Sequence, residues 1–443
     1  MIIINITDYP LRNNKRKFFY YSFVLVRSLI STCIFFILLG CGADKKSESE
    51  YPIIDVVCSV EKYQLVYCSD YFSSIELIPL ETREGCLLSE HSNPPIILKD
   101  SFIFIGRDDA LFAFSTSGKF LHQIGRKGQG PGEYMWASRF FLNTDKSVIY
   151  IEDQKILEYD YNGNHINSIQ KPSVGNQRSY GFSYVGDGVF VSNIFNDGKN
   201  KYKYYLVNQD GELVDSLPNQ VFFNRIGTRG GTYDQALPPI RVDNRLYLKD
   251  YINDTIYIVK DLKLQPAYVF GFGKYTFPLE YLEISDMKIN PIPLNSFTFS
   301  YGLSIVGMRE YFFYRVRVPD LFSKPKAKPI YNSITGGYLQ NESHVYGIYN
   351  TVENTNVLLD TDEFFQKGIM NDINGGLPIV PKHYAGDGVV VDVWYAENMK
   401  EILTDEYFEK QQIKDPQAHQ KLKEILKNMD VYDNPVVVVA RLK

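Results

Sequence analysis

The chain has 443 residues, of which 44% are hydrophobic and 22% charged, so it is long and apolar enough to fold around a large core. Its net charge of −5 gives no electrostatic case for nucleic acid, and we expect no such partner. Aromatic residues, mainly Tyr and Phe, make up 15% of the chain and favour β-strands.

The N-terminal residues predict export and a lipid anchor. Basic residues Arg12 to Lys17 precede an apolar run, Ser28 to Gly40, which has the length of a signal segment and is too short to span a bilayer. The run ends in Leu38-Leu39-Gly40-Cys41, which resembles the lipobox of bacterial lipoproteins. We expect residues 1–40 to be a signal peptide, Cys41 to carry lipid that holds the chain on a membrane, and residues 41–52 to form a polar tether. The alternative is a signal anchor with a chance cysteine.

The cysteines do not predict a complete disulfide framework. Cys33 lies in the signal peptide and Cys41 carries the lipid, which leaves the odd set Cys58, Cys68 and Cys86. Pairing of Cys58 with Cys68 and isolated thiols are both compatible with the sequence. No CxxC or Cys/His zinc spacing occurs. We predict no metal and no cofactor, and the alternative is a metal site assembled from residues that are distant in the sequence.

A repeated strand–turn–strand pattern predicts the fold. Successive turn glycines lie 45 and 48 residues apart, and another strand precedes each copy. A period in the forties with several short strands is typical of β-propeller blades, whereas a β-sandwich has no reason for periodicity and β-helix repeats are shorter. The copies are Leu111–Leu121, Ile156–Ile166 and Tyr204–Val214, with turn glycines Gly118, Gly163 and Gly211, and a fourth copy without the glycine is Ile256–Leu264.

A glycine-rich run, Gly125–Tyr134, lies between two predicted strands and predicts the connector between blades. A phosphate-binding loop would lead into a helix and carry an adjacent Lys-Ser/Thr pair, but here Pro131 interrupts and a strand follows. Arg126 and Lys127 are candidates to face an anionic ligand, and a solvated turn is the alternative.

The later blades are less regular. Tyr311–Val318 and Lys328–Asn332 predict a fifth blade, and Val345–Tyr349 and Gly388–Trp394 predict a sixth. The pattern becomes helical between residues 403 and 430, which predicts a short helical insertion.

Two features predict how the chain ends. Asp415 followed by Pro416 predicts an N-cap and the first residue of a helix. Val436–Leu442 predicts a final strand, and we expect it to pair with Ile75–Leu80 or the strand before it, because a propeller must close its ring.

A family resemblance rests on these residues. The run Ile124–Tyr134, with the strands Val148–Asp153 and Ile156–Asp160 after it, looks like the NHL-type repeat of six-bladed propellers. More closely, residues 50–443 resemble the six-bladed β-propeller lipoproteins of Bacteroides and relatives. The resemblance implies an all-β, six-bladed propeller over residues 53–443 and an outer-membrane location in the bacterial envelope, facing the periplasm or the cell surface. It implies no catalytic residue. The further matching segments are Ile78–Thr82, Asn371–Pro378 and Asn434–Val438.

One segment of the family pattern is a candidate ligand loop. Asn371, Asp372 and Asn374 place oxygen-bearing side chains beside two glycines, a composition that suits Ca²⁺, but the twelve-residue EF-hand pattern is absent. A loop built on Asx-turns is the alternative.

The predicted function follows from the predicted fold and the expected cellular location. We expect a lipid-anchored binding or scaffold module that recognises a glycan, a peptide or a partner envelope protein through loops at one end of the propeller channel. The alternative is a carbohydrate-active enzyme, a glycoside hydrolase or lyase, with carboxylates converging at the channel mouth. The sequence leaves open whether the protein is an enzyme.

Overall fold

The structure is a computed structural model of the chain. It describes residues 50–60, 62–88, 95–143, 145–172, 179–194, 196, 198–224, 236–282, 296–299, 305–322, 324–332, 337–342, 344–364 and 366–443. By its contacts the chain divides into two units, Met1–Glu50 and Tyr51–Lys443, and the second is the one described below. The predicted signal peptide, Cys41 and the tether up to residue 49 lie outside the described residues.

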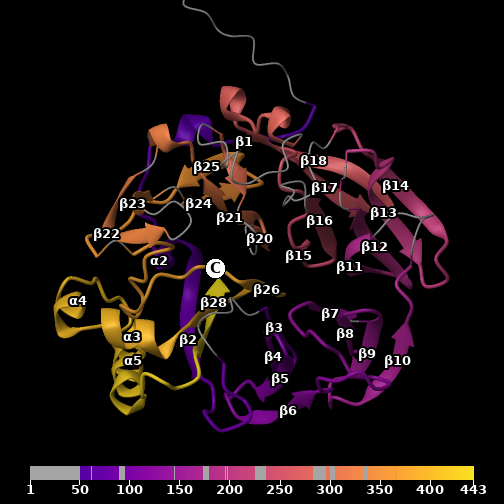
Figure 1. The fold of residues 1–443 in the computed structure, drawn as a ribbon. Coiled ribbons are helices and arrows are strands. Elements are labelled where there is room, and N and C mark those ends of the chain that lie inside the picture. Colours follow the sequence, from indigo (N-terminus) through magenta and orange to yellow (C-terminus); the bar gives the residue numbers. More distant parts are fainter. Residues whose placement is uncertain are drawn as a thin grey trace, which may run out of the picture. The chain divides into compact units, whose positions relative to one another are not determined.

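The second unit is an all-β, six-bladed β-propeller, as predicted (Figure 1). The first three blades each have four antiparallel strands in sequence order. Blade 1 consists of β3 (Ile96–Lys99), β4 (Phe102–Arg107), β5 (Ala110–Ser115) and β6 (Phe120–Ile124). Blade 2 consists of β7 (Phe140–Asn143), β8 (Val148–Glu152), β9 (Ile156–Asp160) and β10 (His165–Ile169). Blade 3 consists of β11 (Ser179–Gly186), β12 (Val189–Ile194), β13 (Tyr202–Asn208) and β14 (Leu213–Pro218).

The next two blades carry extra strands. Blade 4 consists of β15 (Ile240–Val242), β16 (Arg245–Lys249), β17 (Thr255–Lys260) and β18 (Lys263–Gly271), and β1 (Ile53–Asp55) pairs parallel with β18. Blade 5 consists of β20 (Ile305–Met308), β21 (Tyr311–Arg317), β24 (His344–Asn350) and β25 (Thr355–Leu358), and β19 (Thr298–Phe299) pairs with β21. A separate hairpin of β22 (Lys324–Asn332) and β23 (Gly337–Glu342) lies between β21 and β24 in sequence.

This hairpin corrects the predicted order of the last strands. The sequence pattern assigned Lys328–Asn332 to the fifth blade and Val345–Tyr349 to the sixth. In the structure residues 328–332 belong to the inserted hairpin, and residues 345–349 belong to β24, which pairs with β21 inside blade 5. The insertion lengthens blade 5 beyond the period of the earlier repeats, so counting by that period moved one strand into the wrong blade.

Blade 6 closes the ring with strands from both ends of the unit. It consists of β26 (His383–Gly386), β27 (Val389–Trp394), β28 (Val436–Leu442) and β2 (Phe72–Pro79), and β2 is the outermost strand. The predicted pairing of the final strand with residues near Ile75–Leu80 is confirmed, since Ile75 lies opposite Ala440 and Ile78 opposite Val437. The two ends of the propeller therefore hold each other.

The helical insertion lies between β27 and β28 and comprises α3 (Ala396–Ile402), α4 (Asp405–Glu409) and α5 (Pro416–Asn428). The start of α5 agrees with the prediction, because Asp415 Oδ1 accepts hydrogen bonds from the backbone N–H groups of Gln417 and Ala418. Among the described residues, no helix has both the length and the apolar character to cross a membrane. The other short helices are α2 (Cys68–Tyr71), η1 (Val57–Ser59), η2 (Gly273–Tyr275), η3 (Leu279–Leu282) and η4 (Asp320–Phe322).

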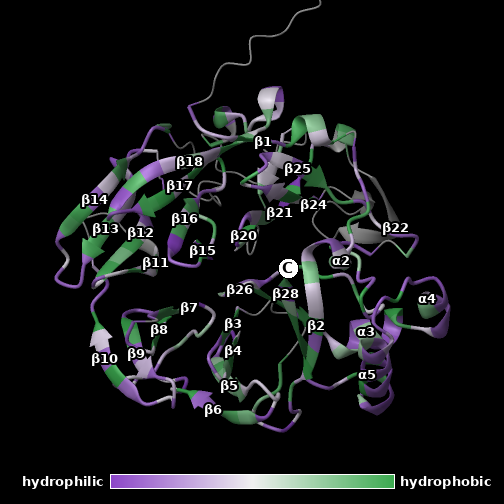
Figure 2. Ribbon diagram, turned by 180° about the vertical axis from the view of Figure 1, so that it is seen from behind, coloured by the Kyte–Doolittle hydropathy of each residue, from purple (hydrophilic) through white to green (hydrophobic). Residues whose placement is uncertain are grey.

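The core lies between neighbouring blades rather than at one centre. The middle strands are largely buried on both faces, because each is covered by the blade on either side, and Figure 2 shows β5 as hydrophobic along most of its length. Val437 of β28, for example, belongs to an apolar cluster that includes Ile103 of β4, whereas its neighbour Val438 belongs to a different cluster that includes residues of blade 5. Each blade therefore depends on the next for burial of its apolar surface.

The turn glycines of the repeat serve this packing. Gly118 has φ +84°, and a Cβ there would lie 2.1 Å from the carbonyl oxygen of Pro79. Its own carbonyl accepts a hydrogen bond of 2.8 Å from Glu81 N, just beyond the outer strand β2. Gly163 is similar, since a Cβ would lie 2.7 Å from the carbonyl oxygen of Gln123 in blade 1. The end of the outer strand of one blade therefore contacts the turn between the two outer strands of the next blade.

Candidate functional site

The connector at residues 125–134 folds back on itself. Arg126 Nε donates a hydrogen bond of 2.6 Å to Glu133 Oε1, and Glu133 Oε2 accepts one of 2.8 Å from Gly130 N. These bonds, that from Gly130 first and that from Arg126 second, lower the pKa of Glu133. The Tyr134 ring is buried, and its hydroxyl donates to the carbonyl of Ile124, where β6 ends. The prediction that this run links two blades is confirmed.

Arg126 and Lys127 both remain exposed in that connector. The Lys127 ammonium lies 5.9 Å from the ring centroid of Trp136, an indole that is 57% exposed. Arg126 is already paired with Glu133, so an anion there would compete with a carboxylate. Binding of an anionic ligand by these two residues stays a prediction.

The second candidate, the loop of residues 371–377, is buried. Asn371, Asp372 and Asn374 are at most 3% exposed. Asn371 Nδ2 donates to Asn374 Oδ1 at 2.7 Å, and Asn374 Oδ1 also accepts from Gly376 N at 2.9 Å. The loop is therefore held by its own amide side chains, in the manner of an Asx-turn. We call residues 371–377 the hub, because three other segments are fastened to it.

Asp372 fastens the N-terminal side of the propeller to the helical insertion. Its carboxylate accepts hydrogen bonds from Ser69 N at 2.9 Å, from Ser69 Oγ at 2.6 Å and from Lys414 Nζ at 2.8 Å. Burial by itself raises the pKa of Asp372, but the donors Lys414 and Ser69 outweigh it, and the pKa is lowered. The carboxylate is thus held in its charged form between α2 and Lys414, two residues before α5.

Two backbone carbonyls of the hub accept hydrogen bonds from the other two segments, α5 and α4. His419 Nδ1 of α5 donates to Asn374 O at 2.8 Å, and Tyr407 OH of α4 donates to Gly376 O at 3.1 Å. Gly375 adopts φ +72°, and a Cβ on Gly376 would lie 2.6 Å from the Trp394 ring. The paired glycines are thus explained by backbone shape and close packing. Whether Asn371, Asp372 or Asn374 also contacts a ligand stays a prediction.

No described group of three or more His, Cys, Asp or Glu side chains is placed to hold a metal ion. Cys58 is exposed and Cys68 and Cys86 are buried, and within the described part of the chain no two of these cysteines form a disulfide. Of the two possibilities left open for Cys58 and Cys68, the structure has isolated thiols.

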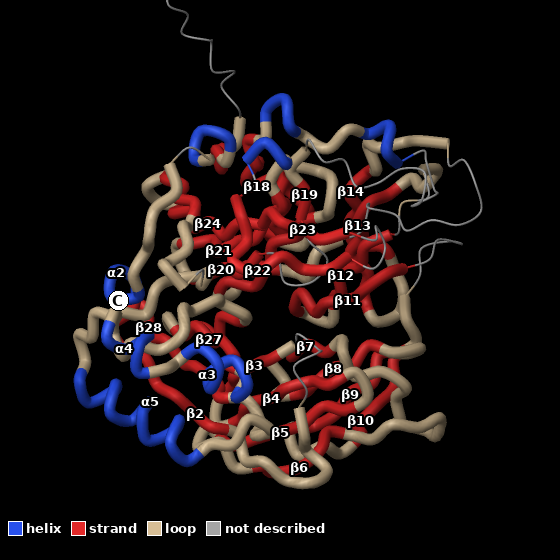
Figure 3. The backbone as a smooth tube through the Cα atoms, turned by 60° about the vertical axis from the view of Figure 1, so that its left-hand side comes forward, coloured by secondary structure: helices blue, strands red, loops and turns tan. Residues whose placement is uncertain are grey.

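Two hollows border the hub. One, of about 660 Å³, is lined by α2 and the start of β2 on one side and by Lys414 and Pro416 on the other. The other, of about 790 Å³, runs between β2 and α5 and includes Asn374 on its wall. Asp415 and Gln417 border both hollows, so the hollows adjoin. Together the two hollows extend along most of β2. In Figure 3, α5 runs beside β2 at this place.

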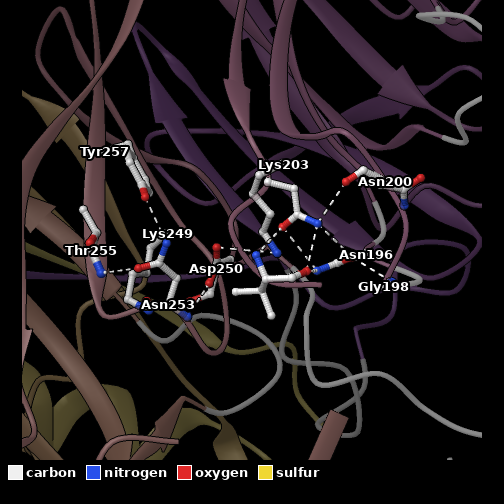
Figure 4. Close-up of polar contacts among 11 residues, drawn as sticks. Asn196, Gly198, Asn200, Lys203, Lys249, Asp250, Asn253, Thr255 and Tyr257 are labelled. Carbon is white, nitrogen blue, oxygen red and sulfur yellow. Dashed lines mark hydrogen bonds and ion pairs between the residues drawn. The ribbon is translucent and has the colours of Figure 1, made fainter. Parts of the chain in front are cut away.

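A buried polar cluster between blades 3 and 4 is the feature that the sequence reasoning missed (Figure 4). The Lys203 ammonium of β13 lies 3.5 Å from Asp250 Oδ2, and both side chains are at most 7% exposed. Lys249, at the end of β16, is fully buried and donates to the backbone carbonyls of Asp250 and Asn253. Its ammonium also lies 4.3 Å from the Phe299 ring centroid, within range of a cation–π interaction.

The same cluster continues through amide side chains (Figure 4). Asn196 and Asn219 exchange hydrogen bonds of 3.3 and 3.2 Å, and Asn196 Oδ1 accepts from Gly198 N. Their loops leave β12 and β14, so the cluster joins the loops of blade 3 to the loop after β16. A lysine at the end of an apolar strand has no sequence pattern that distinguishes it from an exposed one, which is why the cluster could not be found earlier.

Two aspartates have raised pKa values. Burial raises the pKa of Asp254 to about 6, although Lys249 opposes this, and Thr276 donates a hydrogen bond to its carboxylate. Burial likewise raises the pKa of Asp392 to about 6, partly offset by Lys382 and by the N–H groups of Val380 and Val393. Asp254 belongs to the loop of blade 4 and Asp392 to β27 of blade 6, and each is held by neighbours in its own part of the chain.

Comparison with known proteins identifies the family. A family model described as Domain of unknown function (DUF4934) matches residues 51–441, which includes all six blades and the hub. The chain belongs to this family. No curated protein matches the sequence.

A solved structure agrees with the DUF4934 propeller in fold. A crystal structure of a protein from Bacteroides fragilis described as exported has 19% identity and a TM-score of 0.60, covering 88% of this chain and 99% of that one. A member of the DUF4221 family from Bacteroides vulgatus has 10% identity and a TM-score of 0.43, covering 84% of this chain and 97% of that one. The first likeness supports the predicted resemblance to Bacteroides propellers at the level of fold. The lipid anchor and the NHL-like repeat type stay predictions.

Proposed function

We propose that this DUF4934 chain is a lipid-anchored protein of the bacterial outer membrane and that its propeller serves as a binding or scaffold module. The proposed ligand is a glycan, a peptide or a partner envelope protein. Export is supported by the basic and apolar N-terminal segments and by the description of the Bacteroides fragilis structure as exported. The proposed anchor is the lipid on Cys41.

The observation that carries the binding role is the pair of adjoining hollows at the hub. A blade needs only a short turn between its second and third strands, yet here residues 395–435 join β27 to β28 and contain three helices in the described chain. The insertion is fastened to the hub by Asp372, Asn374 and Gly376, so its position beside β2 is fixed. Concave surfaces held rigidly in this way are where ligands bind most often.

The test is a glycan array and a peptide array probed with the mature protein purified from membranes in detergent. We expect selective binding to one ligand class, and that binding should fall when the hub is altered by Asp372→Ala. Absence of binding to both arrays, together with failure to crosslink any envelope protein in cells, contradicts the proposal. Release of shortened sugars from a bound glycan would instead support the carbohydrate-active enzyme.

The anchor has its own test. Cys41→Ser removes the sulfur that carries the lipid, so we expect the protein to move from the membrane fraction to the soluble fraction after cell lysis. Cys33→Ser is the matched control, since Cys33 lies within the predicted signal peptide. Firm membrane attachment of the Cys41→Ser protein contradicts lipidation at this residue.

A further inference from the structure

The outer edge of β2 is an unpaired strand edge beside a groove. β2 is the last strand of blade 6, and among the described strands it pairs only with β28, on one side. We call the hollow of about 790 Å³ between Ile75–Pro79 and α5 the β2–α5 groove. An exposed strand edge presents N–H and C=O groups that another extended chain can pair with.

The hydrogen-bond alternation shows which residues of β2 face the groove. Leu80 N donates to the carbonyl of Pro435, so Leu80 faces β28. In an antiparallel pair every second residue faces the partner strand, so the N–H and C=O groups of Ile75 and Leu77 point the other way. Pro79 shares this outward side and has no N–H, as is usual for proline on an edge strand. Ile75, Leu77 and Pro79 all line the groove.

The wall of the groove contains a buried amide without an acceptor. The Asn374 side chain is fully buried, and among the described residues its Nδ2 has no hydrogen-bond partner. Its Oδ1 already accepts from Asn371 and Gly376, which fixes the orientation of the amide. A buried donor without an acceptor is unfavourable, so an acceptor that reaches it is favoured.

The charges that line the groove are mostly negative. Four carboxylates face one ammonium, and Glu76 and Glu424 lie on opposite sides of the groove, both exposed. Such a lining attracts positive side chains and disfavours an acidic partner. The other charged lining residues are Asp415, Asp433 and Lys421.

We propose that the β2–α5 groove binds an extended, basic peptide segment of a partner protein, which adds to β2 as a fifth strand of blade 6. The proposal rests on the binding role above and assigns it a ligand class and a position. Main-chain pairing with Ile75 and Leu77 supplies affinity, and Glu76 and Glu424 select lysine or arginine side chains. β2 has eight residues, so a segment of similar length occupies it.

The probe is a fluorescein-labelled octapeptide of alternating Lys and Val, and the measurement is fluorescence anisotropy with the mature protein. We expect saturable binding that weakens as salt rises, and much weaker binding of the matched Glu and Val octapeptide. Two further Lys and Val peptides carry N-methyl groups on alternate residues. One has them on the odd-numbered residues and the other on the even-numbered residues, so each blocks one edge of the extended peptide. Only the peptide whose methyl groups block the edge that pairs with β2 should fail to bind.

The protein variants locate the interaction. The charge reversals Glu76→Lys and Glu424→Lys together should weaken binding at least about tenfold, which is about 1.4 kcal/mol. Glu409→Lys is the matched control, because Glu409 is exposed on α4 and does not line the groove, and it should change binding less than twofold. Hydrogen exchange should slow at the amides of Ile75 and Leu77 when the probe is bound. Circular dichroism of each variant shows that it is folded.

The outcomes separate this proposal from the broader one. No binding of the Lys and Val peptide at high micromolar protein overturns the basic-peptide assignment, and binding elsewhere on the propeller would leave the binding role intact. Equal effects of the two N-methyl patterns overturn strand addition. Sedimentation that shows a dimer broken by Glu76→Lys assigns the edge to a second copy of this chain instead.

Discussion

Gly118 and Gly211 are equivalent turn residues of two repeats, yet their surroundings differ. Both have φ +84°, but a Cβ on Gly118 would lie 2.1 Å from Pro79 O, whereas nothing lies within 4 Å of one on Gly211. Gly211→Ala should therefore lower the free energy of unfolding only by the strain of a left-handed backbone at a residue with a Cβ, about 1–2 kcal/mol. Gly118→Ala should cost at least about 2 kcal/mol more, since the clash separates blade 1 from blade 6. Guanidinium unfolding of both variants measures the difference, and equal losses would show that the interblade contact carries no energy.

A second residue-scale prediction concerns Asp392. Its pKa is about 6 in the folded protein and 3.8 in the unfolded chain, so its contribution to stability is complete below pH 3.8 and is lost as the pH rises through 6. The shift corresponds to about 3 kcal/mol. Asp392→Asn should flatten the fall in unfolding free energy between about pH 4 and pH 6, although it also loses one acceptor for a backbone N–H. Asp210→Asn, in the exposed turn after β13, is the control for replacing a carboxylate by an amide.

At the scale of elements, the start of α5 gives a direct test of capping. Asp415 Oδ1 accepts from two backbone N–H groups in the first turn, and Asp415→Ala leaves them without that acceptor. We expect a loss of about 1 kcal/mol and faster hydrogen exchange in the first turn of α5. Asp415→Ser keeps a side-chain acceptor and should retain most of the protection. Unchanged exchange in the alanine variant would mean that contacts with the hub hold the helix without the cap.

Elements with a strong local pattern were predictable from the sequence, and those set by distant contacts were not. The repeats at Leu111–Leu121 and Ile156–Ile166 predicted their strands, because apolar runs around a turn glycine require few assumptions. Lys328–Asn332 has no repeat period to locate it, and it belongs to the inserted hairpin β22–β23 rather than to the predicted fifth blade. The roles of Asn371, Asp372 and Asn374 depend on Ser69, Lys414 and His419, which are remote in sequence, so the sequence located the loop without its partners.

At the scale of the whole molecule, ring closure makes the blades interdependent. β28 lies between β27 and β2, and its alternating residues pack toward blade 1 and toward blade 5. Loss of this strand would expose the outer strand β2, the hub and two interblade cores together. The surface proposed to bind a ligand is therefore assembled only when the ring is closed.

Val437 provides the test of that dependence. It is fully buried against blade 1, and a carboxylate there would be buried without a partner, at a cost of several kcal/mol. Val437→Asp should lower the guanidinium midpoint strongly, whereas Val352→Asp, at a site 74% exposed, should not.

The chain has two tryptophans, so Trp136→Phe leaves Trp394 of blade 6 as the only indole reporter. Fluorescence of Trp394 and far-ultraviolet circular dichroism should then change at the same denaturant concentration, because blade 6 cannot open without releasing its neighbours. A fluorescence transition that precedes the loss of strand signal would show instead that blade 6 unfolds alone and that the other five blades persist without closure.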